Sequence, residues 1–336
     1  MMTKRLTDIR YSILELDVIS EGLTPADVYR NSLLLAQAAE KQGYYRFWLA
    51  EHHNAASLAC SATPVLIGHI AGGTNKIRVG SGGVMLPNHS PLIVAEQFGT
   101  LATLYLQRVD LGLGRAPGTD QTTAHAIRSD RMQAVFQFPE EIEKIQRYFS
   151  SSNRHAQIRA VMAEGVEVPL YILGSSTNSA HLAAKKGLPY AFASHFAGEQ
   201  LFDALDIYRA NFRPSSELGH PYVIVGINVI VAETKAEAEK EFSSLIKMFY
   251  NVLSGVSTPM QQGVEMTDEL RKLAGHPLMK AMLKYTFVGT KEEVRHSVQF
   301  FLSQTNADEL MVVTNVFDPQ ARMVSYQLFS EIMREI

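Results

Sequence analysis

Apolar runs alternate with amphipathic stretches along the whole chain. The runs lie at residues 11–16, 44–50, 76–86, 108–114, 168–174, 189–194, 222–232 and 308–314. Most are nearly continuous in apolar residues, which is typical of strands in a parallel sheet covered on both faces. The stretches between them show helical periodicity. Ile142, Ile145 and Phe149, for example, share one face of a helix predicted over 138–149.

Residue types at the ends of these stretches mark where helices begin and end. Thr24 followed by Pro25 predicts an N-cap and a first helical residue, and Gly43 predicts the end of that helix. The Ser/Thr-x-x-Glu spacing of a capping box occurs at Thr234–Glu237 and at Thr290–Glu293. Further helices are predicted over 64–71, 91–106, 176–186, 198–211 and 319–333.

Eight strands that alternate with helices predict an α/β fold of the (β/α)8, or TIM barrel, type, in one domain over residues 1–336. A doubly wound open sheet is the main alternative, because it has the same repeat. The strand count and the lack of an interdomain linker favour the barrel. Two insertions, Ala116–Phe138 after the fourth strand and Asn251–Phe287 after the seventh, lie outside the repeat. We expect them to cover the catalytic face as lids or pocket walls.

Composition narrows the classes of partner and compartment. The chain of 336 residues is 46% hydrophobic with a formal net charge of −3 and no dense basic stretch, so we expect no nucleic-acid partner. No apolar stretch approaches the roughly 18 residues of a membrane span, and none follows the basic N-terminus, so neither a span nor a signal peptide is expected. The single cysteine, Cys60, fits a reducing compartment. These features predict a soluble, cytoplasmic protein.

Polar or glycine-rich clusters follow five of the predicted strands. They are EHHN (51–54), GSGGVMLP (80–87), GRAPG (114–118), GSSTNS (174–179) and SHF (194–196). In a TIM barrel the active site lies at the carboxyl ends of the strands. We therefore expect the five clusters to converge on one mouth.

The cluster after the fifth strand predicts an anion site. Gly174 ends the strand, and Ser175, Ser176 and Ser179 open a helix whose free backbone N–H groups would face an anion. An ordinary N-cap is the alternative, since serine is favoured there in any case. Arg115, after the neighbouring strand, favours a phosphate, because a guanidinium can bind one bidentately.

Glycines in the third and fourth strands are unusual, because glycine weakens a strand interior. GSGG at 80–83 indicates either a β-bulge or a backbone distortion against a planar ligand, and the residues alone do not choose between them. The glycines at 112, 114 and 118 lack the spacing of a Rossmann turn, so a dinucleotide is not predicted. Gly112 and Gly114 are instead expected to let a flat group approach the backbone.

EHHN admits three interpretations. A shared metal ion is disfavoured, because the adjacent residues His52 and His53 would point in opposite directions and no HExxH motif occurs; no metal is predicted. The others are a base at the pocket, with one histidine inward, or a polar pair packed under a loop. Cys60 has no evident activating partner and no GxSxG motif occurs, so covalent hydrolase chemistry is not supported.

Five segments together resemble the bacterial luciferase-like flavin monooxygenase family: RFWLAEHHN, VGSGGVMLPNHSPLIVAEQFGTL, RVDLGLGRAPGTD, LYILGSSTNSAHLAAKKGLPYAFASHF and NADELMVVTNVFD. The resemblance implies a (β/α)8 barrel that uses FMN, reduced by a separate flavin reductase, and O₂. It implies oxygenation of a small organic substrate through a flavin 4a-hydroperoxide. It also implies a homodimer, for which the small residues of SATPVLIGHIAGG (61–73) would allow close helix packing.

The resemblance implies a role for each motif. His52 matches the pocket histidine that acts as base or hydrogen-bonding partner near the flavin, with Glu51 and His53 in the same pocket wall. Gly82 and Gly83 match a non-prolyl cis peptide beneath the isoalloxazine ring. The residues that match the phosphate loop or line the ring are Arg115, Gly174, Ser175, Ser176, Ser179, Ser194, His195 and Phe196. Bacterial luciferase has a cysteine near the reactive flavin edge where this chain has Gly114, so light emission is not inferred.

Two alternatives stay open. Relatives on the same barrel transfer hydride with a deazaflavin and without O₂, and an FMN-binding protein with little turnover would keep the same motifs. A metal-dependent hydrolase on this fold is a more distant possibility. The sequence does not name the substrate, because specificity would depend on the two insertions.

Overall fold

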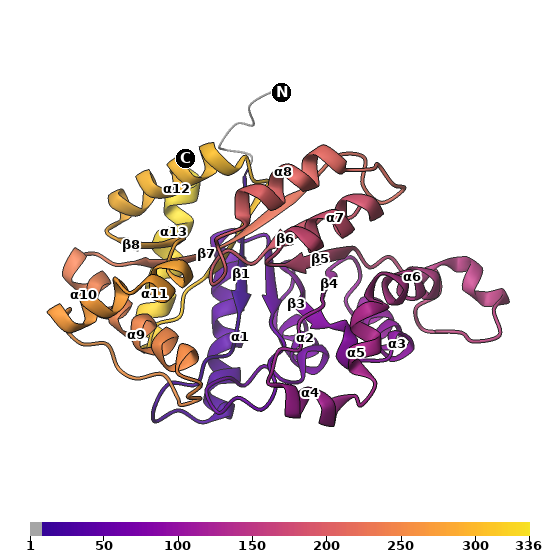
Figure 1. The fold of residues 1–336 in the computed structure, drawn as a ribbon, viewed down its shortest axis with the longest axis horizontal. Coiled ribbons are helices and arrows are strands. Elements are labelled where there is room, and N and C mark those ends of the chain that lie inside the picture. Colours follow the sequence, from indigo (N-terminus) through magenta and orange to yellow (C-terminus); the bar gives the residue numbers. More distant parts are fainter. Residues whose placement is uncertain (1–8) are drawn as a thin grey trace.

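The computed structural model describes residues 9–336; residues 1–8, part of the N-terminus where no signal peptide is predicted, lie outside it. The described strands are β1 (Arg10–Glu15), β2 (Arg46–Leu49), β3 (Arg78–Met85), β4 (Val109–Gly114), β5 (Leu170–Gly174), β6 (Tyr190–Phe192), β7 (Val223–Val231), β8 (Thr286–Gly289) and β9 (Glu309–Val313). All pair in parallel, and a ring β1-β2-β3-β4-β5-β6-β7-β9 closes through the β6–β7 and β9–β1 pairings. The predicted (β/α)8 barrel is confirmed (Figure 1).

The predicted number of strands is too low by one within residues 9–336, because β8 was not foreseen. β8 begins inside the stretch 251–287 that the sequence analysis treats as an insertion, and it pairs only with β7. β7 pairs with β6 and β9 inside the ring, and its end, Asn228–Val231, pairs with β8. A strand that extends beyond the ring leaves backbone N–H and C=O groups to be satisfied, and β8 satisfies them.

Helices surround the ring, as the figure shows (Figure 1). They are α1 (Pro25–Gln42), α2 (Thr63–Gly72), α3 (Pro91–Leu104), α6 (Phe138–Phe149), α7 (Thr177–Lys186), α8 (Leu201–Asn211), α9 (Lys235–Leu253), α12 (Lys291–Thr305) and α13 (Pro319–Glu335). The predicted capping boxes at Thr234 and Thr290 are both present, and Thr24 caps α1. Gly43 ends α1 with φ 85°, a left-handed conformation that glycine adopts without strain. None of the helices described for residues 9–336 is long and apolar enough to cross a bilayer.

Both insertions contain short helices and contact loops at the carboxyl ends of the strands. The first insertion holds α4 (Gln121–Ile127) and α5 (Arg131–Phe136). Its Gly118 carbonyl accepts a hydrogen bond from the backbone N–H of His53, in the loop after β2, at 3.0 Å. The second holds α10 (Asp268–Ala274) and α11 (Pro277–Met282), and it forms a β-bridge between Met260 and Ser20 in the loop after β1. The insertions therefore lie at the end of the barrel where the sequence analysis expects them.

A buried ionic network fills the opposite, amino-terminal end of the barrel. The guanidinium of Arg46, 1% exposed, donates to Asp110 at 2.7 Å and to Glu309 at 2.8 and 3.1 Å. Arg78 donates to Asp110 at 2.9 Å, and the Tyr222 hydroxyl donates to Glu309 at 2.7 Å. Because these side chains close the amino-terminal end, the carboxyl ends of the strands remain as the mouth of the barrel.

Candidate active site

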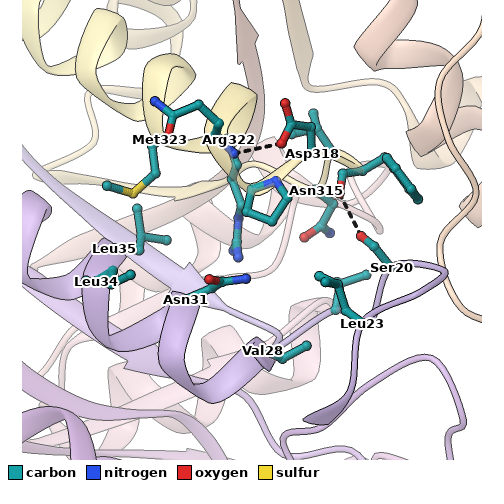
Figure 2. Close-up of a pocket in the computed structure, with 15 residues that line it drawn as sticks. Ser20, Leu23, Val28, Asn31, Leu34, Leu35, Asn315, Asp318, Arg322 and Met323 are labelled. Atoms are coloured by element: carbon teal, nitrogen blue, oxygen red, sulfur yellow. Dashed lines mark hydrogen bonds between the residues drawn. The ribbon is translucent and has the colours of Figure 1, made fainter. Parts of the chain in front are cut away.

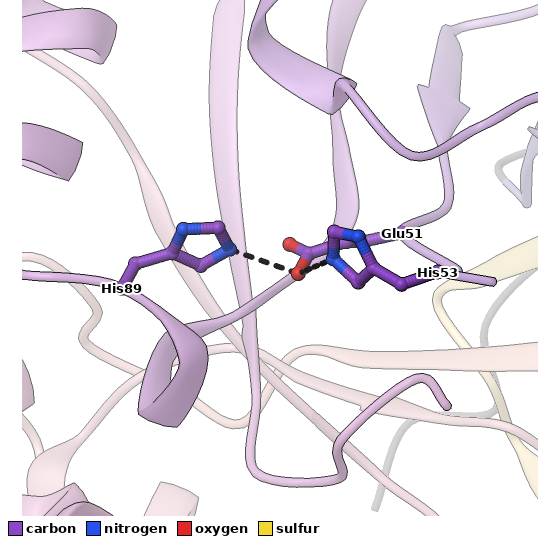
Figure 3. A group of neighbouring side chains, drawn as sticks. All are labelled: Glu51, His53 and His89. Atoms are coloured by element: carbon purple, nitrogen blue, oxygen red, sulfur yellow. Dashed lines mark hydrogen bonds and ion pairs between the residues drawn. The ribbon is translucent and has the colours of Figure 1, made fainter. Parts of the chain in front are cut away.

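Glu51 follows β2 and connects its own loop to the loop after β3 at the mouth (Figure 3). Its Oε1 accepts from Nε2 of His53 and from Nε2 of His89, each at 2.8 Å, and from Nδ2 of Asn88 at 3.2 Å. Its Oε2 accepts from the backbone N–H of Met85 at 2.9 Å. Burial alone would raise the pKa of Glu51, but the hydrogen bonds from His53 and His89 lower it to about 2. Glu51 is therefore an anion at neutral pH.

Glu51, His53 and His89 also offer three potential metal-ligand atoms within 4.8 Å of one another. His89, which the turn η2 (Leu86–Asn88) places beside Glu51, could not be paired with EHHN from the sequence alone. Both Nε2 atoms lie at hydrogen-bond distance from one shared oxygen, and both oxygens of Glu51 have N–H donors. These contacts define a hydrogen-bonded carboxylate, and we assign no metal to it.

The ring of His52 makes different contacts from that of His53, as the alternation of side chains predicts. Nδ1 of His52 lies 3.6 Å from Sγ of Cys60, a contact that the sequence analysis does not foresee. Burial lowers the pKa of His52. Burial also raises the pKa of the Cys60 thiol, as do the nearby Asp17 and Glu15 carboxylates. Both side chains are thus uncharged at neutral pH, and the thiol is not activated as a nucleophile.

His195 follows β6 and provides a buried imidazole at the mouth. Burial lowers its pKa to about 4, and the proximity of His52 adds to this effect. Among residues 9–336, Nδ1 of His195 has no hydrogen-bond partner. Gly226 of β7 makes room for the ring, because a Cβ there would lie 2.5 Å from Nδ1. This nitrogen is therefore covered by the protein beside β7, and the described structure gives it no polar partner.

The two neighbours of His195 differ in what they offer a ligand. The Ser194 hydroxyl is buried and donates to the carbonyl of Gly226 at 2.6 Å, so its proton is already used within the protein. Phe196 is 45% exposed, and its ring meets that of His195 edge to face at 4.9 Å between centroids. Phe196 is thus open to a ligand in this geometry, whereas His195 is buried and the Ser194 hydroxyl is turned toward β7.

The peptide bond between Gly82 and Gly83 is cis, as the resemblance implies. It lies where the pairing of β3 with β4 shifts register between Ser81 and Val84, so the segment combines an irregular pairing with a distorted backbone. A Cβ on Gly112 would lie 2.2 Å from the Ser81 carbonyl oxygen, and one on Gly114 would lie 2.9 Å from Sδ of Met85. Strand packing by itself explains Gly112, which meets a backbone oxygen, but not Gly114, which meets only the flexible end of Met85; Gly114 as a pocket residue stays a prediction.

The start of α7 has the features of an anion site. Ser176 is the N-cap, and in the described structure its hydroxyl makes no capping hydrogen bond. The backbone N–H of Thr177 donates to Oε1 of Gln200 at 3.1 Å, which shows that an oxygen acceptor fits against this helix end. Gly174 and Ser175 precede it at intermediate burial. Because β4 pairs with β5, the exposed Arg115 after β4 lies along the same edge of the sheet.

Ser179 is placed differently from the other predicted phosphate residues. Its hydroxyl donates to the Ser176 carbonyl at 2.6 Å and lies 3.0 Å from the Tyr190 hydroxyl. A Cβ on Gly174 would lie 2.2 Å from Oγ of Ser179, so Gly174 accommodates this inward-turned side chain. In this geometry the Ser179 proton is not available to a phosphate, and Ser179 instead holds the turn between β5 and α7.

A separate cavity of about 320 Å³ lies between α1 and the start of α13 (Figure 2). Its polar lining includes Asn31, Asn315 and Arg322, and the guanidinium of Arg322 is held by Glu15 at 2.7 Å and by the Thr314 carbonyl at 2.9 Å. None of the site residues predicted from the sequence lines it. The predicted residues instead gather at the barrel mouth.

Sequence reasoning missed four residues that support the mouth. His89 stands in NHSP, directly after the third strand, and this position at a strand end is the signal that could have identified it. Gly226 and Asn228 lie inside an apolar run; Asn228 donates to the His195 carbonyl at 2.5 Å, but only the closed ring brings β7 beside His195. Gln200 reaches Thr177 from another helix connection, and no local signal marks it.

Residues 9–308 match the family model for luciferase-like monooxygenases, so the chain belongs to that family. It is 44% identical over 98% of both chains to a luciferase-like monooxygenase of Escherichia coli (strain K12). It is 34% identical to the N-acetyl-S-alkylcysteine monooxygenase of Bacillus subtilis (strain 168), covering 96% of this chain and 98% of the relative.

Solved structures share the barrel. The crystal structure of apo-MsnO8 superposes with a TM-score of 0.88 at 34% identity, over 96% of this chain and 98% of the other. The oxygenating constituent of 3,6-diketocamphane monooxygenase from Pseudomonas putida, in complex with FMN, has a TM-score of 0.70 at 16% identity, over 97% and 98% of the chains. An F420-dependent secondary alcohol dehydrogenase has a TM-score of 0.68 at 17% identity, over 96% and 98%. The last two show the fold alone, in proteins that bind flavins of two kinds.

Proposed function

We propose that this protein is an FMN-dependent monooxygenase that uses reduced FMN and O₂ to oxygenate a small organic substrate. A separate flavin reductase would supply the reduced FMN in the cytoplasm, and the working unit would be a homodimer of single-domain chains. Membership of the luciferase-like monooxygenase family supports a flavin oxidoreductase. The relatives named as monooxygenases, at 34% and 44% identity, favour oxygenation over hydride transfer.

The observation that carries the proposal is the pair of neutral imidazoles at the mouth, those of the half-buried His52 and the buried His195. Hydrogen-bonding groups removed from water act strongly on charge that develops beside them. The cis peptide of Gly82–Gly83 lies on a neighbouring strand at the same end of the barrel. This set fits a planar, polar-edged ring better than it fits a metal or a covalent intermediate.

Different residues of the chain would bind different parts of the cofactor. Arg115, the Ser175 and Ser176 hydroxyls and the N–H groups at the start of α7 would bind the phosphate, with Gln200 moving aside. Gly82 and Gly83 would support the ring. His52 and His195 would hydrogen-bond near its reactive edge, and Glu51 would hold His53 and the loops in place. When bound, reduced FMN supplies the electrons that activate O₂.

Rapid mixing of the protein, loaded with reduced FMN, against O₂ tests the proposal. We expect flavin reoxidation slower than that of free reduced FMN, through a transient absorbing species that is absent without protein. Reoxidation at the rate of free flavin would contradict a monooxygenase. Binding of F420, with hydride transfer to it under anaerobic conditions, would indicate the deazaflavin alternative. Tight binding of oxidised FMN with neither activity would indicate a flavin-binding protein.

A further inference from the structure

Cys60 and His52 are fixed side by side by the loop that follows β2. Cys60 is fully buried, and its Sγ lies 3.6 Å from Nδ1 of His52. The backbone N–H of His52 donates to the Cys60 carbonyl at 3.3 Å, and the N–H of Ala59 donates to the Asp17 carbonyl at 2.9 Å. Thr63 Oγ1 donates to the carbonyl of Ala50 at 2.9 Å and closes the loop. The thiol therefore has a defined position beside the imidazole.

The contact between Sγ and Nδ1 determines where a neutral His52 carries its proton. Sulfur is a weak acceptor, whereas a bare imidazole nitrogen is a good one, so the favourable arrangement has S–H donating to Nδ1. The backbone N–H groups of His52 and Cys60 also face the sulfur, and because they are donors they cannot accept the S–H proton. The pKa values of both residues oppose proton transfer from the Cys60 thiol to His52, which would give a thiolate–imidazolium pair. Burial lowers the pKa of His52, and burial with the Asp17 and Glu15 carboxylates raises the pKa of Cys60.

We propose that Cys60 is a positioning residue whose thiol donates to Nδ1 of His52 and thereby fixes the tautomer in which Nε2 carries the proton. His52 then presents a hydrogen-bond donor, not a basic nitrogen, to a ligand at the mouth. Of the two roles that the family resemblance implies for His52, base or hydrogen-bonding partner, the proposal selects hydrogen-bonding partner. The catalytic consequence rests on the proposed function, but the tautomer itself does not.

Nitrogen-15 NMR of the imidazole rings tests the tautomer directly in the full-length protein. Histidine is labelled, and the His52 signals are identified by their loss in His52→Gln among the 11 histidines. We expect the wild-type protein at pH 7–8 to show a protonated Nε2 and a bare Nδ1 for His52. Cys60→Ser should keep this tautomer, and Cys60→Ala should populate both. A protonated Nδ1 in the wild-type protein, or an unchanged tautomer in Cys60→Ala, would overturn the proposal.

The same variants test the consequence for flavin chemistry. Serine and alanine remove the same sulfur but differ in one O–H donor, so they form a matched pair. We expect Cys60→Ala, loaded with reduced FMN, to reoxidise about tenfold faster than wild type, equivalent to about 1.4 kcal/mol, and Cys60→Ser to stay within about threefold. Equal rates in the two variants would show that Cys60 only packs. Wild-type reoxidation at the free-flavin rate would refute the proposed function, while the NMR result would still decide the role of Cys60.

Discussion

Replacing Glu51 with glutamine should destabilise the protein by an amount that depends on pH. Glu51 is 2% exposed, and its pKa falls from the usual 4.5 to about 2 because N–H donors surround the carboxylate. This difference in pKa between the unfolded and folded states corresponds to about 3 kcal/mol of stability at pH 7. Because the folded-state pKa is below the unfolded one, this contribution is complete well above pH 4.5 and declines as pH falls toward 2. At pH 3 about 1.4 kcal/mol would remain.

Urea unfolding followed by tryptophan fluorescence measures this effect, because Trp48 is the single tryptophan and lies 1% exposed in the barrel. Glu51→Gln should lose about 3 kcal/mol relative to wild type at pH 7, and the gap should narrow to about 1.4 kcal/mol at pH 3. Glu199→Gln, at an exposed glutamate, is the control and should change stability by less than about 0.5 kcal/mol. A loss below about 1 kcal/mol, or a gap that does not vary with pH, would refute the assignment of Glu51 as a hydrogen-bonded anion.

Four further predictions use other parts of the structure. Arg115→Ala should weaken FMN binding by about 10- to 150-fold in fluorescence titrations, since a charge-assisted hydrogen bond contributes about 1.5–3 kcal/mol. Riboflavin, which lacks the phosphate, should bind as before. Equal losses of affinity for FMN and riboflavin would show that Arg115 does not bind the phosphate. Arg46→Met should cost about 3–5 kcal/mol in urea unfolding because Asp110 and Glu309 lose a buried partner, and a cost near that of the exposed Arg30→Met would contradict this. Gly226→Ala should displace His195, since the new Cβ would lie 2.5 Å from its Nδ1, and should thereby weaken flavin binding. The control Gly219→Ala, whose new Cβ has nothing within 4 Å, should leave binding unchanged. Equal flavin affinities of the two variants would argue against His195 as a ligand contact. Val65→Glu on α2, at a side chain 71% exposed, should dissociate the proposed homodimer in analytical ultracentrifugation, and a monomeric wild type would show that the dimer prediction is wrong.

The local chemistry of the chain determined the repeat of strands and helices. These signals act over a few residues, so they can be recognised in the sequence without knowledge of the fold. They are the apolar runs, the capping boxes at Thr234 and Thr290, and Gly43 at the end of α1. β8 was missed because its four residues are only partly apolar and it forms to pair with the overhanging end of β7. Such a strand is set by its neighbour, not by its own sequence.

The sequence by itself also determined that EHHN, GSGG, GRAPG, GSSTNS and SHF would meet, because the carboxyl ends of parallel strands in a barrel share one rim. Only the tertiary structure decided what each side chain does there. It joined His89 to Glu51, placed Cys60 beside His52, and turned the hydroxyls of Ser179 and Ser194 toward backbone carbonyls. Those outcomes depend on contacts between segments far apart in the chain, where sub-ångström packing selects the partner of each polar atom.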